Sequence, residues 1–320
     1  MFVGLTQNDF ACYEPRKWKS NVFNRERLEV RQKLLALGQA VSGSLLGPDG
    51  APLFLEASVE HPAIWNHKQV EHQSIYFSRP EAARKQLDGF IDRQKPMASL
   101  LDDPTPQRNH LFLGVTVSHE SLEVVLKIHP DALVDRQNLE RKLEEHYEAE
   151  RFLGLLQDLD PAFSIGVLPV LHPVTPDFSM ERLAEIVGTL PSAGGLAVPG
   201  QPVHMFALTR SLPAKEAAGL SPSEQQAFVQ TTLLALLPLY RFVVWTREND
   251  FVSMAEVLDK EKVVRRQRGL QKGDRVRVVR GMLTGKEGVV AEADAKGHLK
   301  VVVGKLALKI DAGDVERLHA

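Results

Sequence analysis

The sequence predicts a large N-terminal domain of mixed α and β structure, followed by a small all-β domain. Segments with helical spacing alternate with short β-rich runs before residue 259. A block of basic residues follows, and from Gly273 onwards short valine-rich runs are separated by glycines, as in small β-proteins. We therefore expect an α+β domain over 1–258, a basic linker over 259–272 and a β-domain over 273–320.

The composition is that of an ordinary globular protein. The 320 residues are 43% hydrophobic and 25% charged, and the length suits about two domains. The most apolar stretch, Leu233–Tyr240, is far shorter than the roughly 20 residues of a membrane-spanning helix. The first residues lack the basic start and apolar core of a secretory signal. We expect a cytoplasmic protein with no membrane partner.

Cysteine is used once, at Cys12. A single cysteine excludes an internal disulfide and cysteine-rich zinc sites. With no catalytic partner nearby, we interpret Cys12 as a small buried or partly buried apolar residue rather than a nucleophile.

Helix and strand signals organise the first half of the chain. Asn24 can cap a helix that reaches Val41, and 47–50 is a turn sequence. Strands are expected over 52–59 and 73–77. Ser78 and Glu81 have capping-box spacing, which predicts the next helix.

A β-hairpin is the clearest local prediction. Its strands are 111–117 and 122–128, which are rich in β-branched and aromatic residues. Asp135 then caps a long helix on which Leu139, Leu143 and Tyr147 face inward. An apolar run over 163–170 and a helix beginning at Asp177 continue the same domain.

The last third of the α+β domain contains a break and a second set of elements. Six of the twelve residues from Pro191 to Pro202 are proline or glycine, which predicts a loop or boundary. A strand is expected over 203–209. Ser221, Pro222 and Glu224 then start a helix. A further strand is expected over Tyr240–Trp245, and a short helix from Ser253.

The net charge of −2 conceals an asymmetry. Residues 260–320 contain 15 lysines and arginines against 8 acidic residues, whereas the preceding part contains 24 against 33. A basic block of this kind is typical of a surface that binds phosphate-rich or acidic partners, although a solvated linker also accounts for it. The candidate nucleic-acid-binding residues are Lys262, Arg265, Arg266, Arg268, Lys272, Arg275, Arg277 and Arg280.

The C-terminal segment is expected to form a barrel. Val276 and Val278 alternate with Arg275 and Arg277, which predicts valines inside and arginines outside. The segment Gly273–Gly281, followed by Gly285, Gly288, Val289 and Val290, resembles the KOW motif of NusG-type elongation factors and certain ribosomal proteins. The resemblance implies an SH3-like five-stranded barrel that docks on RNA, a ribosomal protein or the transcription machinery. It also implies that Gly273, Gly281 and Gly288 serve turns and that Val276, Val278 and Val289 form the core.

The resemblance does not extend to the preceding domain. A NusG-type protein has a short domain with a Trp-Tyr-Val-like strand before the barrel, whereas about 260 residues of a different, acidic unit stand here. The N-terminal domain is not recognised as a known family.

Histidines are the candidates for chemistry in that domain, because eight of the eleven lie from His61 to His172. Their spacing matches no familiar zinc arrangement, and phosphate-binding, dinucleotide-binding and hydrolase motifs are missing. We expect no metal and no cofactor. The residues to examine are His61, His67, His72, His110 and His129.

Two functions follow from these patterns. The first is a non-enzymatic binding protein that docks on RNA or on a nucleoprotein complex, such as RNA polymerase or the ribosome, through the basic linker and the KOW-like barrel. An acidic protein is the other partner such a surface fits. The alternative is a nucleic-acid-processing enzyme with a histidine-based site, which requires those histidines to converge with a carboxylate in one pocket.

Overall fold

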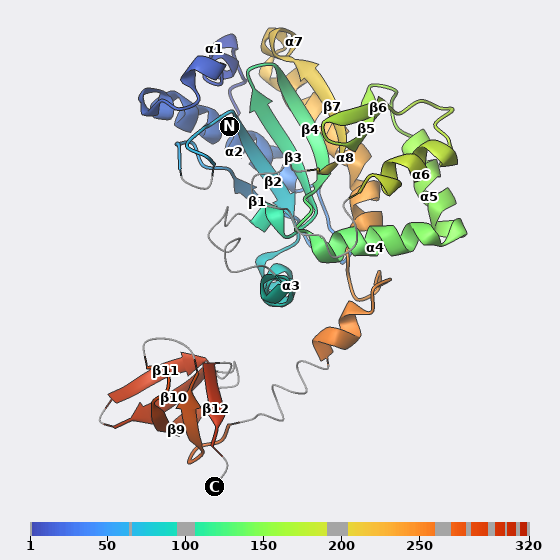
Figure 1. Cartoon of the computed structure of the whole chain (residues 1–320). Helices are drawn as coiled ribbons and strands as arrows, with labels where there is room; N and C mark the ends of the chain where they lie inside the picture. The colour runs from blue at the N-terminus through green and yellow to red at the C-terminus, as the bar shows by residue number, and fades with distance from the viewer. Residues whose placement is uncertain are drawn as a thin grey trace. The chain divides into compact units, whose positions relative to one another are not determined.

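The chain forms two units, each containing one antiparallel sheet (Figure 1). The computed structural model describes residues 2–63, 66–94, 106–190, 204–259, 270–279, 283–293, 298–304, 306–311 and 314–318. Contacts within the chain divide it into Met1–Val252 and Ser253–Ala320. The prediction of mixed helix and sheet, with a separate sheet near the C-terminal end, is confirmed.

The larger unit is built on a seven-stranded sheet with the order β1-β2-β3-β4-β7-β5-β6. The predicted hairpin is present as β3 and β4, with Phe112 opposite Lys127. Neighbouring strands in this sheet run antiparallel. The strands are β1 (Phe54–Ala57), β2 (His72–Ser78), β3 (Phe112–Ser118), β4 (Ser121–Ile128), β5 (Phe163–Val167), β6 (Val170–Pro173) and β7 (Phe206–Pro213).

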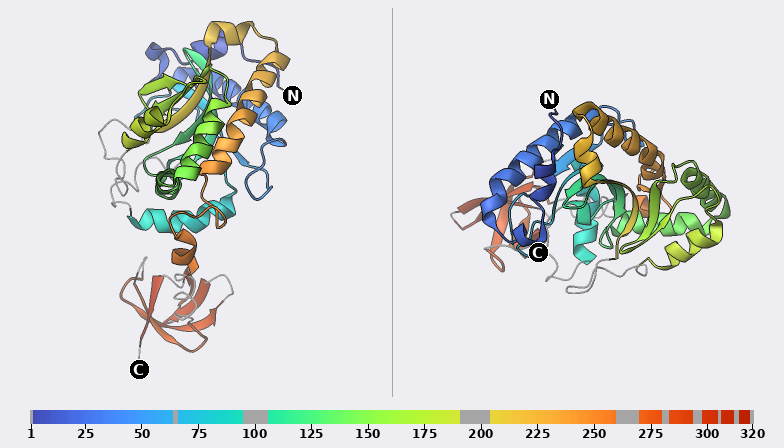
Figure 2. Two further views of the ribbon diagram at one scale, coloured as in Figure 1. Left: turned by 90° about the vertical axis from the view of Figure 1, so that its right-hand side faces the viewer. Right: turned by 90° about the horizontal axis from the view of Figure 1, so that it is seen from above.

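Helices α2 and α8 pack against each other and against the sheet (Figures 1 and 2). Helix α2 contacts β1 and β2, whereas α8 contacts β3 and β4. Helices α3 and α4 contact each other at one end of the sheet (Figure 1). The α-helices are α1 (Gln7–Ala11), α2 (Asn24–Ser42), α3 (Glu81–Gln94), α4 (Leu133–Glu144), α5 (His146–Gln157), α6 (Met180–Gly188), α7 (Ala214–Gly219) and α8 (Pro222–Val243), and Pro15–Lys17, Asn21–Phe23 and Pro106–Arg108 are 3₁₀ turns.

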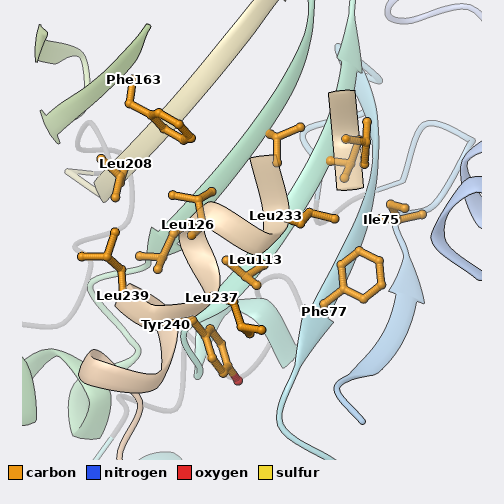
Figure 3. Close-up of a cluster of buried hydrophobic side chains, with 14 of the residues drawn as sticks. Ile75, Phe77, Leu113, Leu126, Phe163, Leu208, Leu233, Leu237, Leu239 and Tyr240 are labelled. Carbon is orange, nitrogen blue, oxygen red and sulfur yellow. The ribbon is translucent and has the colours of Figure 1, made fainter. Parts of the chain in front are cut away.

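The apolar core lies between these two helices and the sheet. Alternate residues of the central strands β2, β3 and β4 face it, among them Ile75, Leu113 and Leu126, and Leu233 of α8 lies in the same cluster (Figure 3). Gly38 allows α2 to pack closely on β1 and β2, because a Cβ there would lie 2.9 Å from side-chain carbons of Leu55 and Ile75. Burying each large apolar side chain stabilises the unit by about 1.5–3 kcal/mol.

Helix α8 begins as predicted and ends later than predicted. Ser221 and Glu224 form the reciprocal capping box. The strand expected over Tyr240–Trp245 is wrong, because the helix continues to Val243. Helix α8 packs on the sheet and also on α4 and α5. The last turns of α8 therefore carry apolar residues on several sides, and the sequence there does not show the 3.6-residue spacing of apolar residues that indicates a helix.

The long helix expected from Asp135 is also corrected. Helix α4 begins at Leu133 with Ala132 as its N-cap, so Asp135 lies inside the first turn rather than capping it. The chain leaves helical geometry at Glu145, where φ is −84° and ψ is 117°, and α5 follows as a separate helix. Tyr147 is 74% exposed instead of facing inward. The predicted loop over 191–202 lies outside the described residues.

The smaller unit contains a five-stranded antiparallel sheet with the order β11-β10-β9-β8-β12. The described strands include no pairing between β11 and β12, so the expected five-stranded barrel is not closed. The short helix predicted from Ser253 is present over 254–259. The strands are β8 (Arg275–Val278), β9 (Glu287–Ala293), β10 (His298–Val303), β11 (Leu306–Asp311) and β12 (Val315–Arg317).

Two expectations for this sheet are corrected. Val276 and Val278 are buried as predicted, but Val289 is 43% exposed and Val290 takes the core position. Gly288 lies within β9 rather than in a turn. A Cβ at Gly288 would lie 2.7 Å from the carbonyl oxygen of Val302, which explains why this strand position has no side chain.

Candidate functional site

The predicted basic residues fall partly within the described chain. Lys272, Arg275 and Arg277 are described, and all three are exposed. The other predicted residues, Lys262, Arg265, Arg266, Arg268 and Arg280, lie outside the described residues. The geometry of the basic surface can therefore be examined on β8 and its neighbours.

Arg275 and Arg277 project from the face of the sheet opposite the valine core. Their side chains are 71% and 48% exposed. Glu287, on the neighbouring strand β9, lies 3.4 Å from Arg275 Nη2 and 3.0 Å from Arg277 Nη2. One carboxylate thus offsets part of the charge of both arginines. Such exposed pairs are weak and screened by salt, so both guanidinium groups can exchange partners.

The same face carries further cations and two exposed valines. Val289 and Val302 are register partners, and both are exposed. Lys300 of β10 is the register partner of Lys309 of β11. Lys300 Nζ lies 3.4 Å from the carboxylate of Glu292. The face therefore combines positive charge with a small apolar area.

A second concentration of charge is buried in the larger unit, at one end of its sheet. Asp135 is 0% exposed. Its carboxylate forms an ion pair with Arg79, and it accepts hydrogen bonds from the backbone N–H groups of Leu111 at 2.8 Å and Trp245 at 2.9 Å. Asp135 thereby joins the segments after β2, before β3 and after α8. Buried charges are costly unless they are paired in this way.

Two further carboxylates extend this polar layer. Asp131 accepts hydrogen bonds from Arg108 at 2.8 and 3.1 Å and lies 3.7 Å from His129 Nδ1. His110 Nε2 lies 3.0 Å from Asp88 Oδ1. The pKa of His110 lies below its ordinary value because the ring is buried. The hydrogen bond to Asp88 offsets only part of this effect. Because a carboxylate can only accept, His110 Nε2 is the donor in this contact.

A pocket of about 310 Å³ lies beside Arg79. The 47–50 turn, the start of α3, the end of α8 and the following segment 244–248 form its walls. Arg241 holds the turn in place by donating to the carbonyl oxygen of Leu46 at 2.8 and 3.1 Å. The lining residues are Gly47, Pro48, Asp49, Leu53, Arg79, Pro80, Ala83, Gln86, Tyr240, Val244, Trp245, Thr246, Arg247 and Glu248.

The segment after α8 is held firmly against α4. Asn249 Nδ2 donates to the carbonyl oxygens of Phe242 at 3.0 Å and Val244 at 2.8 Å. Lys142 Nζ donates to Asn249 Oδ1 at 2.7 Å. Because these bonds fix the backbone on both sides of Trp245, the pocket wall is a formed part of the fold.

The five candidate histidines do not form one site. His72 begins β2 opposite Ser118, the last residue of β3, whereas His110 precedes the first residue of β3. Seven strand residues span about 20 Å. His110 and His129 are paired with different carboxylates, and His61 is exposed beside Glu60. None of the five lines the pocket beside Arg79. The described ranges hold no group of three or more potential metal-ligating side chains.

The sequence interpretation missed the buried layer and the pocket. It assigned Asp135 to a helix cap and Tyr240–Trp245 to a strand, and Arg79 stood out only as part of a capping-box segment. A buried charge pair between residues 56 positions apart leaves no local pattern. The one available signal was a capping-type aspartate directly after the apolar residues Leu133 and Val134.

Comparisons with known proteins add no family to this geometry. A scan against protein-family models and a search of curated proteins both found no match. Across the residues described, no helix is long and apolar enough to cross a membrane.

Proposed function

We propose that the protein is a non-enzymatic binding protein that docks on RNA within a nucleoprotein complex, using the basic segment 260–280 and the exposed face of the C-terminal sheet. The observation that carries the proposal is the alternation on β8. Val276 and Val278 are buried, while Arg275 and Arg277 stand on the opposite, exposed face. The strand thus holds two guanidinium groups outward on a packed support.

The charge of the preceding segment extends this surface along the chain. Nine basic residues and only Glu261 and Asp274 occur between Lys260 and Arg280. Lysine and arginine contacts to phosphates release counterions and carry little base information. The expected binding is therefore strong at low salt, weak at high salt and only slightly dependent on base sequence.

An SH3-like barrel of the KOW type is the architecture we propose for the C-terminal unit. Five antiparallel strands with a valine core and β12 returning to β8 support this proposal. The exposed pair Val289 and Val302 gives the same face an apolar area. A face of mixed character suits a complex that contains both RNA and protein.

The proposal is tested by titrating the intact protein with labelled single-stranded RNA, duplex DNA and an unrelated acidic protein at increasing salt. We expect saturable RNA binding, with a log–log salt slope that falls by about 0.7–0.9 for each phosphate contact removed. Replacing Arg265, Arg266 and Arg268 with glutamate should abolish binding. Arg275→Glu combined with Arg277→Glu should weaken it strongly.

A matched control reverses three exposed arginines of the larger unit, Arg25, Arg151 and Arg182, to glutamate. It changes the total charge by the same amount as the triple variant of the basic segment, and it should keep most of the RNA affinity. No saturable nucleic-acid binding at low salt would refute the proposal. Binding to the acidic protein alone would favour a protein-docking surface instead.

A further inference from the structure

We infer that the outer face of the C-terminal sheet, which is the face opposite its valine core, docks in the minor groove of base-paired RNA. This choice rests on the proposed RNA-docking function and names the form of RNA that the face binds. Three features support it: the absence of aromatic side chains, the order of the charges across the strands, and the distance between the positive rows.

The C-terminal unit has no aromatic side chain on which an unpaired base can stack. Residues 253–320 contain no phenylalanine, tyrosine or tryptophan. Proteins that bind single-stranded RNA hold its bases largely by stacking them on aromatic rings. Between the charged positions the outer face carries Val289 and Val302, whose branched side chains offer no flat surface. A duplex needs no such platform, because its bases already stack on one another.

The charges of the outer face form two positive rows with a negative row between them. Strand β9 lies between β8 and β10, and β11 follows β10. The carboxylates stand on β9, and the cations stand on the strands at either side of it. The side chains are Arg275 and Arg277 on β8, Glu287 and Glu292 on β9, Lys300 on β10 and Lys309 on β11.

The ion pairs between these rows leave the cations available to a partner. Glu287 lies 3.4 Å from Arg275 Nη2 and 3.0 Å from Arg277 Nη2, and Glu292 lies 3.4 Å from Lys300 Nζ. Each of these five side chains is at least 44% exposed. Exposed pairs of this kind stabilise a protein little, so phosphates can displace the carboxylates.

Two positive rows match the two phosphate backbones that border a groove. Neighbouring strands lie about 4.8 Å apart, so β8 lies about 10 Å from β10 and about 14 Å from β11. The minor groove of B-form DNA, about 6 Å wide, is too narrow for this spacing. Its major groove is about 8.5 Å deep, which is too deep for a strip of valine and glutamate side chains to reach the floor. The minor groove of A-form RNA is wide and shallow.

The carboxylates between the rows favour RNA over DNA. A carboxylate only accepts hydrogen bonds, and it repels a phosphate. The minor groove of A-form RNA displays ribose 2′-hydroxyls, which are donors and are absent from DNA. When the two backbones lie over the positive rows, Glu287 and Glu292 face these hydroxyls. A single strand lying along the middle of the face would instead bring its phosphates against them.

The test is a competition experiment with the full chain at low salt. The probes are an RNA duplex, a DNA duplex of the same sequence, and a single-stranded RNA that does not self-pair and carries the same number of phosphates. We expect the RNA duplex to bind about tenfold or more tightly than either of the other two. The DNA duplex controls for the higher charge density of any duplex.

Glu287 and Glu316 provide a matched pair of variants. Both are exposed register partners of Arg277, but Glu287 lies between the positive rows, whereas Glu316 lies on β12, outside them. Each change to alanine removes one negative charge beside the same arginine. Glu287→Ala should reduce the ratio of RNA-duplex to DNA-duplex affinity, and Glu316→Ala should leave this ratio unchanged. A general gain in charge would change both variants alike.

The lysine row is tested by changing Lys300 and Lys309 to alanine together. This variant should lose the preference for the RNA duplex over the single strand, because only the β8 row remains to contact a backbone. The control changes Lys85 and Lys215, two exposed lysines of the larger unit, to alanine. It loses the same charge and should keep the preference.

A measurement on the wild-type protein keeps the test decisive if a variant does not fold. Adding the RNA duplex should shift the amide NMR signals of Val289 and Val302 between the rows, as well as those of β8 and β11. Shifts confined to β8 would overturn the minor-groove assignment. So would equal affinity for the RNA duplex and either other probe, or equal effects of Glu287→Ala and Glu316→Ala on the affinity ratio. In each of these cases RNA docking itself still stands, whereas no binding of any nucleic acid refutes both proposals.

Discussion

The carboxylate of Asp135 and the guanidinium of Arg79 form an ion pair that is almost closed to solvent, with side-chain exposures of 1% and 7%. The two residues come from α4 and from the connection between β2 and α3. The same carboxylate also binds the backbone of Leu111 and Trp245. Asp135 therefore holds together four segments that are distant in the sequence. Because Arg79 and Trp245 line the pocket, this ion pair also fixes part of the pocket wall.

We predict that Asp135→Asn lowers the free energy of unfolding of the larger unit by about 3 kcal/mol or more. Removing one partner leaves the Arg79 charge buried without compensation, which typically costs about 3–5 kcal/mol. Urea denaturation followed by circular dichroism measures the change. Glu185→Gln, which breaks the exposed pair between Arg182 and Glu185, should have almost no effect. Equal stability of Asp135→Asn and the wild type would contradict the assigned role.

Local signals in the sequence predicted local elements. The capping box of Ser221 and Glu224 and the β-branched and aromatic runs that predicted β3 and β4 depend on neighbouring residues only, and both elements were found in the structure. Asp135 was misassigned because its partners are distant: a capping-type residue near a helix start looks the same whether its carboxylate binds its own helix or another segment. Tyr240–Trp245 was misassigned because a short apolar run fits a strand and a buried helix end equally well.

The candidate sites divide in the same way. Arg275 and Arg277 could be found from the sequence, because strand alternation alone places them opposite Val276 and Val278. The pocket could not, since it requires Arg79, Tyr240 and Trp245 to meet through the fold. The pairing of Glu287 with both arginines was also beyond the sequence, because it depends on the register between β8 and β9.

Two glycines of the smaller unit should respond differently to the same substitutions. Gly288→Ala places a Cβ against the Val302 carbonyl oxygen and two valine side chains, and we expect a loss of about 1–3 kcal/mol from overpacking. Gly285 has open space but a φ of +84°, which strains residues with a Cβ. Gly285→Asn should therefore be tolerated better than Gly285→Ala, because asparagine adopts this conformation more readily.

At Gly288 we expect the opposite ranking of the two variants: Gly288→Asn should be less stable than Gly288→Ala, because the larger side chain meets the same close neighbours. Thermal denaturation followed by the amide NMR signals of β8 to β12 distinguishes the two cases. If asparagine and alanine rank the same way at both positions, the steric explanation for Gly288 is wrong.

The stability of the larger unit should fall as the pH drops below about 6.5, in part through His110. Burial holds the pKa of His110 below its ordinary value of 6.5 in the folded protein. The unfolded chain therefore binds the proton first, and the free energy of unfolding decreases with falling pH, by at most about 1.4 kcal/mol per pH unit for one group. The stability that depends on uncharged His110 is fully present above pH 6.5. It is lost as the pH falls towards the pKa of His110 in the folded protein.

His110→Gln should reduce this slope, measured by urea denaturation at several pH values between 5 and 7.5. His146 is 86% exposed, so His146→Gln serves as the matched control and should keep the wild-type slope. An unchanged slope in His110→Gln would show that another group is responsible.

Cys12 should be unreactive towards thiol reagents while the protein is folded. Burial raises the pKa of its thiol to about 11, so little thiolate is present at pH 8. The thiol also donates to the carbonyl oxygen of Asn8 at 3.2 Å. Reaction with a chromogenic disulfide should be slow in buffer and fast in 6 M guanidinium chloride. Rapid labelling of the folded protein would contradict the buried assignment.

The two units should unfold separately, because among the described residues their apolar cores have no residue in common. The core of the smaller unit consists of Val276, Val290, Val301 and their neighbours, all between Leu270 and Val315. We predict that Val301→Ala, which removes two methyl groups from a fully buried site, unfolds the smaller unit at a lower temperature and leaves the transition of the larger unit unchanged. Val302→Ala is the matched control, since Val302 is exposed on the same strand. A fragment of residues 253–320 should also give a dispersed amide spectrum, although so small a core makes it only marginally stable. If Val301→Ala shifts both transitions equally, the units are coupled and the division at Val252 does not describe how the protein folds.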